Sequence, residues 1–239
     1  MTKFLNDLVK RSLRYEPLAD TAKPRQFIKM VRQPGLPYCP DPEGDLLHGL
    51  ITQHGCNRCL EIGFATGSTA IYMLNALASK GGTLISIDIP TGHMNQTGLS
   101  NLKKAEMTDR HRLILENSVT AIPRLFMDGM KFDLIFLDGW KTFDHMAVEL
   151  FFLTRMLVLD GFLVFDDANM PSVYKIIKLM QRYYGYHEID YARYNQTGRL
   201  RLFQILTTRT LRRPYRAIRK VKNEIDLPVT QDWNFFADF

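Results

Sequence analysis

The sequence is poor in cysteine. Its 239 residues include three cysteines, Cys39, Cys56 and Cys59, which cannot all pair with one another. Because nothing in the sequence suggests export, we expect reduced thiols and no disulfide framework. Cys56 and Cys59 follow His54 closely, but no second pair of ligands lies downstream. The sequence therefore does not predict a structural zinc site.

The sequence also predicts neither a signal sequence nor a membrane-spanning segment. The N-terminus, MTKFLNDLVKRSL, contains scattered charges and no continuous apolar stretch. The longest uncharged run, from Ile62 to Ser79, contains glycine, serine, threonine and asparagine. This composition fits a buried strand, loop and helix better than a bilayer span. We therefore expect a cytoplasmic protein without a transmembrane segment.

The net charge of +6 is unevenly distributed. Residues 209–222 carry seven basic residues and no acidic residue. Such a segment is either a solvated tail or a contact for an anionic partner, namely a membrane surface, nucleic acid or an acidic substrate. Tyr215 is its only aromatic residue. Because base stacking needs aromatic side chains, we favour the solvated tail.

Short apolar runs alternate with helical patterns from residue 58 onward, and no repeat is visible. The apolar runs predict strands at 58–64, 83–89, 111–117, 132–138, 161–167, 185–193 and 199–208. The helical patterns lie at 5–13, 24–31, 44–54, 67–79, 99–107, 119–126, 143–157 and 171–183. Proline, glycine and polar residues predict loops at 33–44 and 91–98.

Continuous apolar strands between amphipathic helices are typical of a parallel sheet covered on both faces. The pattern predicts a doubly wound, Rossmann-like α/β fold with a mostly parallel seven-stranded sheet. The last two predicted strands have no helix between them, which predicts an antiparallel pair at one edge. We expect a helical N-terminal addition (1–55), a core domain (56–208) and a basic and aromatic tail (209–239).

Polar residues follow the first three strands, where parallel sheets of this kind bind ligands. A glycine-containing turn, 61–68, follows the first strand, and Asp88 ends the second. An acid at that place commonly binds the two hydroxyl groups of a ribose. Asn117 and Ser118 follow the third strand, where they could contact the edge of an adenine ring. The order of these features predicts an adenosine-containing cofactor. The G-x-G-x-x-G pattern of dinucleotide-binding proteins is absent, although a nicotinamide-dependent reductase stays an alternative.

The segment LEIGFATGS (60–68) resembles the first motif of class I S-adenosylmethionine-dependent methyltransferases, with Ala65 in place of the middle glycine. The resemblance implies that Glu61 helps to hold the methionine amine and that Gly63 and Gly67 shape the pocket. It also implies that Asp88 binds the ribose. The predicted cofactor-binding residues are Glu61, Gly63, Ala65, Gly67, Ser68, Asp88, Asn117, Ser118, Asp138 and Trp140.

Three aspartates end the fourth and fifth predicted strands: Asp138, Asp166 and Asp167. Neighbouring strand ends lie close together, so these carboxylates should converge and repel one another. A divalent cation would relieve the repulsion, because Mg²⁺, Mn²⁺ and Ca²⁺ prefer oxygen ligands. The alternative is that one aspartate caps a helix and another pairs with lysine or arginine.

FLDGWKTF (136–143) is similar to a stretch of metal-dependent catechol O-methyltransferases, and GLPYCPDPEGDLLHGL (35–50) resembles the segment before their core. The likeness covers about residues 36–206. It departs from the catechol type at Asp167, where that family has asparagine and relatives acting on sugars and antibiotics have aspartate. It implies a divalent cation and methylation of a small-molecule hydroxyl, either a phenol or a sugar; a carboxylate acceptor also fits.

We expect Lys141 to be the catalytic base, because a lysine beside a dication has a lowered pKa, with His145 as a second candidate. Asp138 would act through the cation. Trp140 would shield cofactor or substrate.

Trp233, Phe235 and Phe236 could cover a pocket or contact a second subunit in a homo-oligomer. The open alternatives are an RNA methyltransferase using residues 209–222 and a cofactor-binding module without activity, whereas nucleic acid is not the expected partner.

Overall fold

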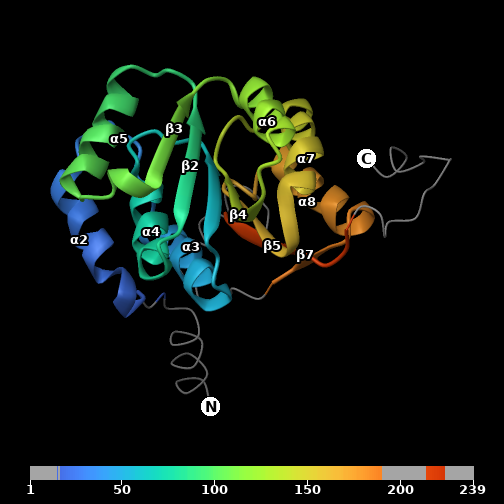
Figure 1. Ribbon diagram of the computed structural model, residues 1–239, viewed down its shortest axis with the longest axis horizontal. Helices are drawn as coiled ribbons and strands as arrows, with labels where there is room; N and C mark the ends of the chain where they lie inside the picture. Colours follow the sequence, from blue (N-terminus) through green and yellow to red (C-terminus); the bar gives the residue numbers. More distant parts are fainter. Residues whose placement is uncertain (1–14, 16, 190–213, 224–239) are drawn as a thin grey trace, which may run out of the picture.

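The computed structural model describes residues 15, 17–189 and 214–223 (Figure 1). Its centre is one seven-stranded sheet in the order β3-β2-β1-β4-β5-β7-β6. All pairings are parallel except those of β7, which is antiparallel to both β5 and β6. The predicted fold class is confirmed. The strands are β1 (Arg58–Ile62), β2 (Thr83–Asp88), β3 (His111–Leu115), β4 (Phe132–Leu137), β5 (Leu157–Phe165), β6 (Tyr186–Glu188) and β7 (Arg216–Lys220).

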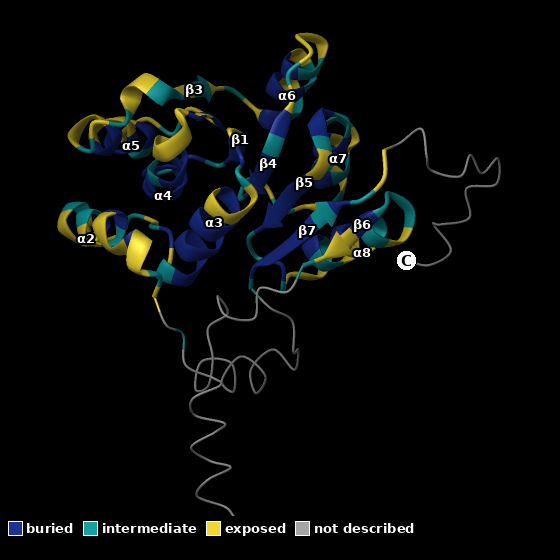
Figure 2. Cartoon of the chain, turned by 60° about the horizontal axis from the view of Figure 1, so that its bottom comes forward, coloured by how far each residue is buried: buried dark blue, intermediate teal, exposed yellow. Residues whose placement is uncertain are grey.

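Helices cover both faces of the sheet because side chains alternate along each strand. In β1, Cys59 belongs to the core on one face and Leu60 to the core on the other. Figure 2 shows buried residues concentrated in the strands. The first face is covered by α2 (Ala22–Val31), α3 (Asp41–His54), α4 (Ser68–Leu77) and α5 (His93–Lys104). The second is covered by α6 (Ser118–Met127), α7 (Phe143–Met156) and α8 (Pro171–Tyr183).

Three short 3-10 helices complete the described elements: η1 (Ala19–Thr21), η2 (Ala78–Lys80) and η3 (Thr108–Arg110). The segment containing η1 and α2 is fixed to α3 by the fully buried Asp45. Its carboxylate accepts hydrogen bonds from Tyr15 Oη (2.6 Å) and Leu18 N (2.7 Å) and lies 3.3 Å from Nη2 of Arg25. A buried charge with this many partners is stable in the interior. The helical N-terminal addition is therefore docked on the core over its described part.

Two helices begin earlier than predicted. α3 starts at Asp41, inside the predicted loop, because Pro40 is its N-cap and Pro42 occupies its first turn, where a missing N–H costs nothing. α5 starts at His93, so most of the predicted loop 91–98 is helical. Here Asn95 Oδ1 accepts a hydrogen bond from Thr91 N at 2.6 Å, which fixes the first turn. The glycine and polar residues of 91–98 predicted a loop, but the hydrogen bond of Asn95 stabilises a helix there.

The last described strand, β7, lies outside the predicted strands. The predicted strand 199–208 and the predicted helix 5–13 fall outside the described residues. The strand between β5 and β6 is β7, inside the segment expected to be a solvated tail. Arg216 binds Glu188 through Nε at 3.1 Å, and Lys220 is buried and donates to the carbonyl of Leu157 at 2.9 Å. These two basic side chains therefore form contacts within the fold and are not part of a solvated tail.

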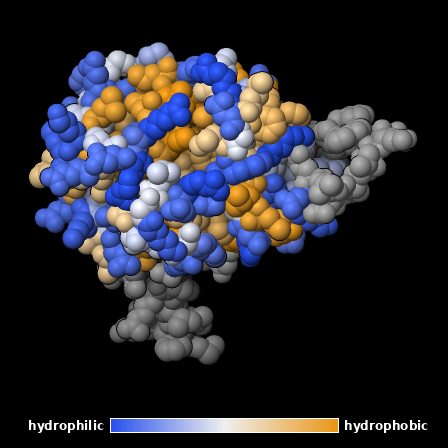
Figure 3. Space-filling model, in the orientation of Figure 1, coloured by the Kyte–Doolittle hydropathy of each residue, from blue (hydrophilic) through white to orange (hydrophobic). Residues whose placement is uncertain are grey.

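No helix in the described ranges combines the length and the apolar character that crossing a bilayer requires. On the face shown in Figure 3, hydrophilic side chains predominate and apolar ones gather in separate patches.

Candidate active site

The turn after β1 brings the backbone of two neighbouring strands together. Gly63 has a φ of 97°, and a Cβ atom there would lie 2.4 Å from the carbonyl oxygen of Asp138. Gly67 has a φ of 70° and is the N-cap of α4. Ala65 lies between them with a φ of 45°, a conformation that normally favours glycine. The turn thus needs glycine at position 63, whereas Ala65 is held by an external contact.

That contact is Asp88 at the end of β2. Its Oδ2 accepts hydrogen bonds from Phe64 N (3.2 Å), Ala65 N (2.8 Å) and Asn95 Nδ2 (3.1 Å). Within the described part of the chain these donors all contact Oδ2, so Oδ1 stays available to a ligand. One carboxylate therefore both fixes the turn and presents an acceptor, as binding a ribose requires.

A cavity of about 640 Å³ lies at this edge of the sheet, outside the carboxyl ends of β1, β2 and β4. Its wall brings together eight of the predicted site residues: Gly63, Ala65, Asp88, Asn117, Ser118, Asp138, Trp140 and His145. The Trp140 residue is 65% exposed, so it forms the rim and is not a core residue. Sequence reasoning missed the apolar lining from Ile62, Ile87, Ile89 and Met94.

Three predicted cofactor residues are not part of the cavity wall. Glu61 is fully buried and accepts a hydrogen bond from Ser86 Oγ at 2.5 Å, while its Oε1 has no partner among the described residues. Burial raises the pKa of Glu61 well above its usual value. Ser68 accepts a hydrogen bond from Cys39 N at 2.8 Å, and Gly67 turns the chain into α4. These three residues support the turn after β1 and do not line the cavity.

The third strand end forms one side of the cavity. Asn117 is the N-cap of α6 and accepts a hydrogen bond from Val119 N at 3.1 Å. Ser118 Oγ lies 3.0 Å from Nε2 of His145, which lies 3.3 Å from Oε1 of the buried Glu149. His145, a predicted base, is thus engaged by Ser118 and Glu149. This arrangement fixes Ser118 at the cavity wall.

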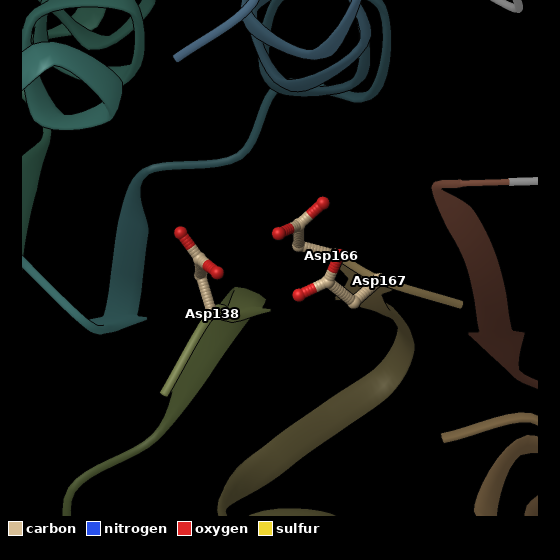
Figure 4. A group of neighbouring side chains, drawn as sticks. All are labelled: Asp138, Asp166 and Asp167. Carbon is tan, nitrogen blue, oxygen red and sulfur yellow. The ribbon is translucent and has the colours of Figure 1, made fainter. Parts of the chain in front are cut away.

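The three predicted acidic residues converge, as Figure 4 shows. Asp138, Asp166 and Asp167 each offer a carboxylate oxygen, and these oxygens all lie within 4.8 Å of one another. The ladder of the sheet places them: Asp138 N donates to the carbonyl of Ile62 at 2.8 Å, and Asp166 N donates to that of Leu137 at 3.1 Å. Asp167 has a φ of 50°, which turns its side chain at the end of β5. We call these three residues the acidic centre.

Lys141 lies at the acidic centre. Its Nζ is 3.0 Å from Asp138 Oδ1, 3.8 Å from Asp166 Oδ2 and 3.9 Å from Asp167 Oδ2. Burial alone would lower the pKa of Lys141, but the carboxylates of Asp138 and Asp166 outweigh burial and raise it. Without a cation the carboxylates thus keep Lys141 as an ammonium group, and the lowered pKa expected beside a bound dication stays a prediction.

Burial and neighbouring charges also set the pKa values of the carboxyl groups. Burial and the neighbouring Asp166 outweigh Lys141 and raise the pKa of Asp138 to about 7. Burial also raises the pKa of Asp167. When all three are ionised, the single ammonium group leaves two negative charges unbalanced, which is the charge of one divalent cation.

Sequence reasoning missed Glu43, a buried carboxyl group in the first turn of α3. It is 3% exposed, and burial, followed by Asp166 and Asp138, raises its pKa well above the usual value. Cys39 Sγ lies 3.6 Å from its Oε2. Nothing in PDPEG distinguishes this residue from a solvated acid at a helix start, so no sequence signal could have found it.

The donor set fits a hard divalent cation. Three carboxylate oxygens converge, and Glu43 Oε1 is a buried atom without a hydrogen-bond partner among the described residues. The cavity fits an adenosyl group, since Asp88 offers Oδ1 and apolar side chains line the space beside it.

Residues 60–168 match a family model described as a methyltransferase domain. Solved structures with a similar fold include cofactor-bound Rv0187 from MTB, which is 16% identical with a TM-score of 0.63, covering 91% of this chain and 96% of that chain. The O-methyltransferase TomG from Streptomyces achromogenes, involved in tomaymycin synthesis and solved with SAM, is 19% identical with a TM-score of 0.61, covering 90% and 96%.

The O-methyltransferase from Bacillus cereus, solved in complex with SAH, is 15% identical with a TM-score of 0.59, covering 92% of this chain and 96% of that chain. At these identities the likeness concerns the fold. A search of curated proteins found no match to the sequence. Residues 60–168 therefore match a methyltransferase domain, and the chain shares its fold with solved O-methyltransferases.

Proposed function

We propose that the protein is an S-adenosylmethionine-dependent O-methyltransferase that methylates a hydroxyl group of a small molecule with the help of a divalent cation. Mg²⁺ is the first candidate, and Mn²⁺ and Ca²⁺ fit the same ligands. One observation carries the proposal: the cavity and the acidic centre share Asp138. A methyl donor and a hydroxyl acceptor would therefore meet at one residue.

The cofactor roles follow from the cavity wall. Asp88 would accept hydrogen bonds from the ribose hydroxyls through Oδ1, because its Oδ2 already holds the turn. Asn117 and Ser118 would contact the adenine edge, and Trp140 would cover the ring from the exposed rim. Glu61 would act on the methionine end indirectly, since its side chain lies behind the turn.

Methyl transfer breaks the bond from sulfur to the methyl carbon and forms a bond from that carbon to the acceptor oxygen. The sulfonium is already a good leaving group, so the enzyme must align the acceptor and remove its proton. Asp138, Asp166 and Asp167 would hold a divalent cation, which would supply a Lewis acid to lower the pKa of the acceptor hydroxyl.

Lys141 is the candidate proton acceptor because its Nζ lies beside all three carboxylates. Its ammonium form is stabilised by those carboxylates, whereas its burial favours the neutral amine. Once the carboxylate charge is balanced, burial is left to lower the pKa of Lys141, so that the amine can take the proton. His145 supports the alignment, because Ser118 and Glu149 already engage its ring.

We expect Asp138→Asn to abolish methyl transfer and to weaken Mn²⁺ binding by at least about tenfold, because a ligand is lost. Methyl transfer from labelled S-adenosylmethionine to a panel of phenols and sugars measures the first effect, and calorimetry with Mn²⁺ measures the second. Asp88→Asn is the reciprocal control: it should weaken S-adenosylhomocysteine binding and leave Mn²⁺ affinity within about threefold of wild type. Full methyl transfer in excess chelator would contradict the role of the cation.

A further inference from the structure

Three polar side chains form a chain of hydrogen bonds across β1, β2 and β3. Glu61 and Ser86 are directly opposite each other in the register of β1 and β2. Ser86 Oγ donates to Glu61 Oε2 at 2.5 Å and lies 2.9 Å from Nε2 of His111. Burial lowers the pKa of His111 to about 4, so its ring is neutral at pH 7. Because the hydroxyl proton of Ser86 is used on Glu61, His111 Nε2–H donates to Ser86.

His111 is also held by the turn after β1. Its ring stacks on that of Phe64, with centroids 5.1 Å apart and planes inclined by 22°. Phe64 is 2% exposed, and its ring fills the space that Gly98 of α5 leaves open by having no side chain. The imidazole is therefore fixed on its face by Phe64 and at Nε2 by Ser86.

Glu61, at the other end of this chain, has one oxygen to offer to a ligand. It is fully buried, and its Oε1 has no hydrogen-bond partner among the described residues. The equally buried Asp45 differs, because both of its oxygens accept hydrogen bonds. A buried acceptor without a donor destabilises the fold, so Oε1 is not explained by stability. Glu61 precedes Gly63 of the cavity wall by two positions, which places this acceptor directly behind the turn.

We propose that Ser86 and His111 are positioning residues of the cofactor site, which hold the Glu61 carboxyl group for the methionine end of S-adenosylmethionine. The inference rests on the proposed function, because it takes S-adenosylmethionine as the cofactor. Neither side chain is part of the described cavity wall, so both act through Glu61. Ser86 occupies Oε2 and leaves Oε1 as the acceptor, and His111 fixes the Ser86 hydroxyl. The ribose is assigned to Asp88, so loss of the hydrogen-bond chain should weaken binding of one end of the cofactor only.

The test compares two ligands by calorimetry on the full chain: S-adenosylhomocysteine, and 5′-methylthioadenosine, which lacks the amino-acid end. Ser86→Ala should weaken S-adenosylhomocysteine binding by about tenfold and leave 5′-methylthioadenosine binding within about twofold of wild type. His111→Phe keeps a ring against Phe64 and loses the nitrogen, so it should give a loss of about threefold with the same selectivity. The double variant should lose no more than Ser86→Ala, because the hydrogen-bond chain is already broken at Ser86.

His48→Phe is the matched control, because His48 is also a buried histidine, with Nε2 at 3.2 Å from Asn75 Oδ1 in another part of the core. It should leave both affinities within about twofold of wild type. Ser86→Ala removes a single oxygen atom and carries the test if a phenylalanine variant does not fold.

Unchanged S-adenosylhomocysteine affinity in Ser86→Ala, or equal losses for the two ligands, would overturn the proposal and leave the proposed function in place. A selective loss in Ser86→Ala without one in His111→Phe would overturn the role of His111. A wild-type protein that binds neither ligand would overturn both the proposal and the proposed function.

Discussion

The ammonium group of Lys141 lies where a cation at the acidic centre would also have to lie. Its Nζ is within 3.9 Å of all three carboxylates. Two positive groups cannot share this space without repulsion, so a bound cation must displace the lysine or share the carboxylates with it. Displacement would free the amine from the carboxylates, as its proposed role in proton transfer requires.

We therefore expect Lys141→Met to strengthen Mn²⁺ binding by about tenfold, the equivalent of roughly 1.4 kcal/mol, and to reduce methyl transfer. Calorimetry on the metal-stripped protein measures the first effect. Lys131→Met is the control, because Lys131 is exposed and donates to the carbonyl of Arg155. Weaker Mn²⁺ binding in Lys141→Met would mean that the lysine supports the cation and does not compete with it.

The individual site residues that could be predicted from the sequence lie directly after the predicted strands. Asp138, Asp166 and Asp167 were predictable because apolar strands of a parallel sheet end at a common edge. Glu43 was not predictable, because its burial in the first turn of α3 depends on tertiary structure. The ion pairs of Lys141 with these carboxylates were not predictable either, since they depend on three distances that a sequence does not give.

Among the elements, the turn between β1 and α4 imposes the strictest requirement on the backbone. Gly63 combines a positive φ with a close approach to the Asp138 backbone. Gly81, between η2 and β2, also has a positive φ of 65°, but a Cβ atom at this position would have no described neighbour within 4 Å. Substituting Gly81 therefore measures the cost of a positive φ alone, whereas substituting Gly63 adds the cost of the close contact with the Asp138 backbone.

We expect Gly81→Ala to lower the free energy of unfolding by about 1 kcal/mol, the usual cost of a left-handed alanine. Gly63→Ala should cost a further ~1–3 kcal/mol, because β1 and β4 must separate locally. It should also weaken S-adenosylhomocysteine binding. Denaturant unfolding compares the two variants. Equal losses would show that the close approach at Gly63 is relaxed in solution.

Element boundaries were predictable where the apolar period was regular, as at α8, whose bounds Pro171–Tyr183 match the prediction. Prediction failed where a few contacts decide the structure. The start of α5 depends on the Asn95 hydrogen bond to Thr91. The strand β7 was obscured by its basic residues, of which Arg216 is paired with Glu188 and Lys220 is bound by backbone carbonyls of the fold.

At the scale of the whole molecule, the cavity and the acidic centre meet at one edge of one sheet. This arrangement does not favour a nicotinamide-dependent reductase, which has no use for converging carboxylates next to its cofactor. The RNA alternative loses part of its support, since Arg216, Arg219 and Lys220 are bound within the fold. Residues 209–213 of the basic segment and the aromatic residues Trp233, Phe235 and Phe236 lie outside the described residues.

An anomalous difference map from a crystal grown with Mn²⁺ and S-adenosylhomocysteine tests the central claim most directly. We predict one strong peak at about 2.0–2.3 Å from oxygens of Asp138, Asp166 and Asp167, with the ribose at Asp88. Lys141 should be displaced from its position among the carboxylates. A map with the cofactor bound but no peak at the acidic centre, and with Lys141 still paired to Asp138, would contradict the account.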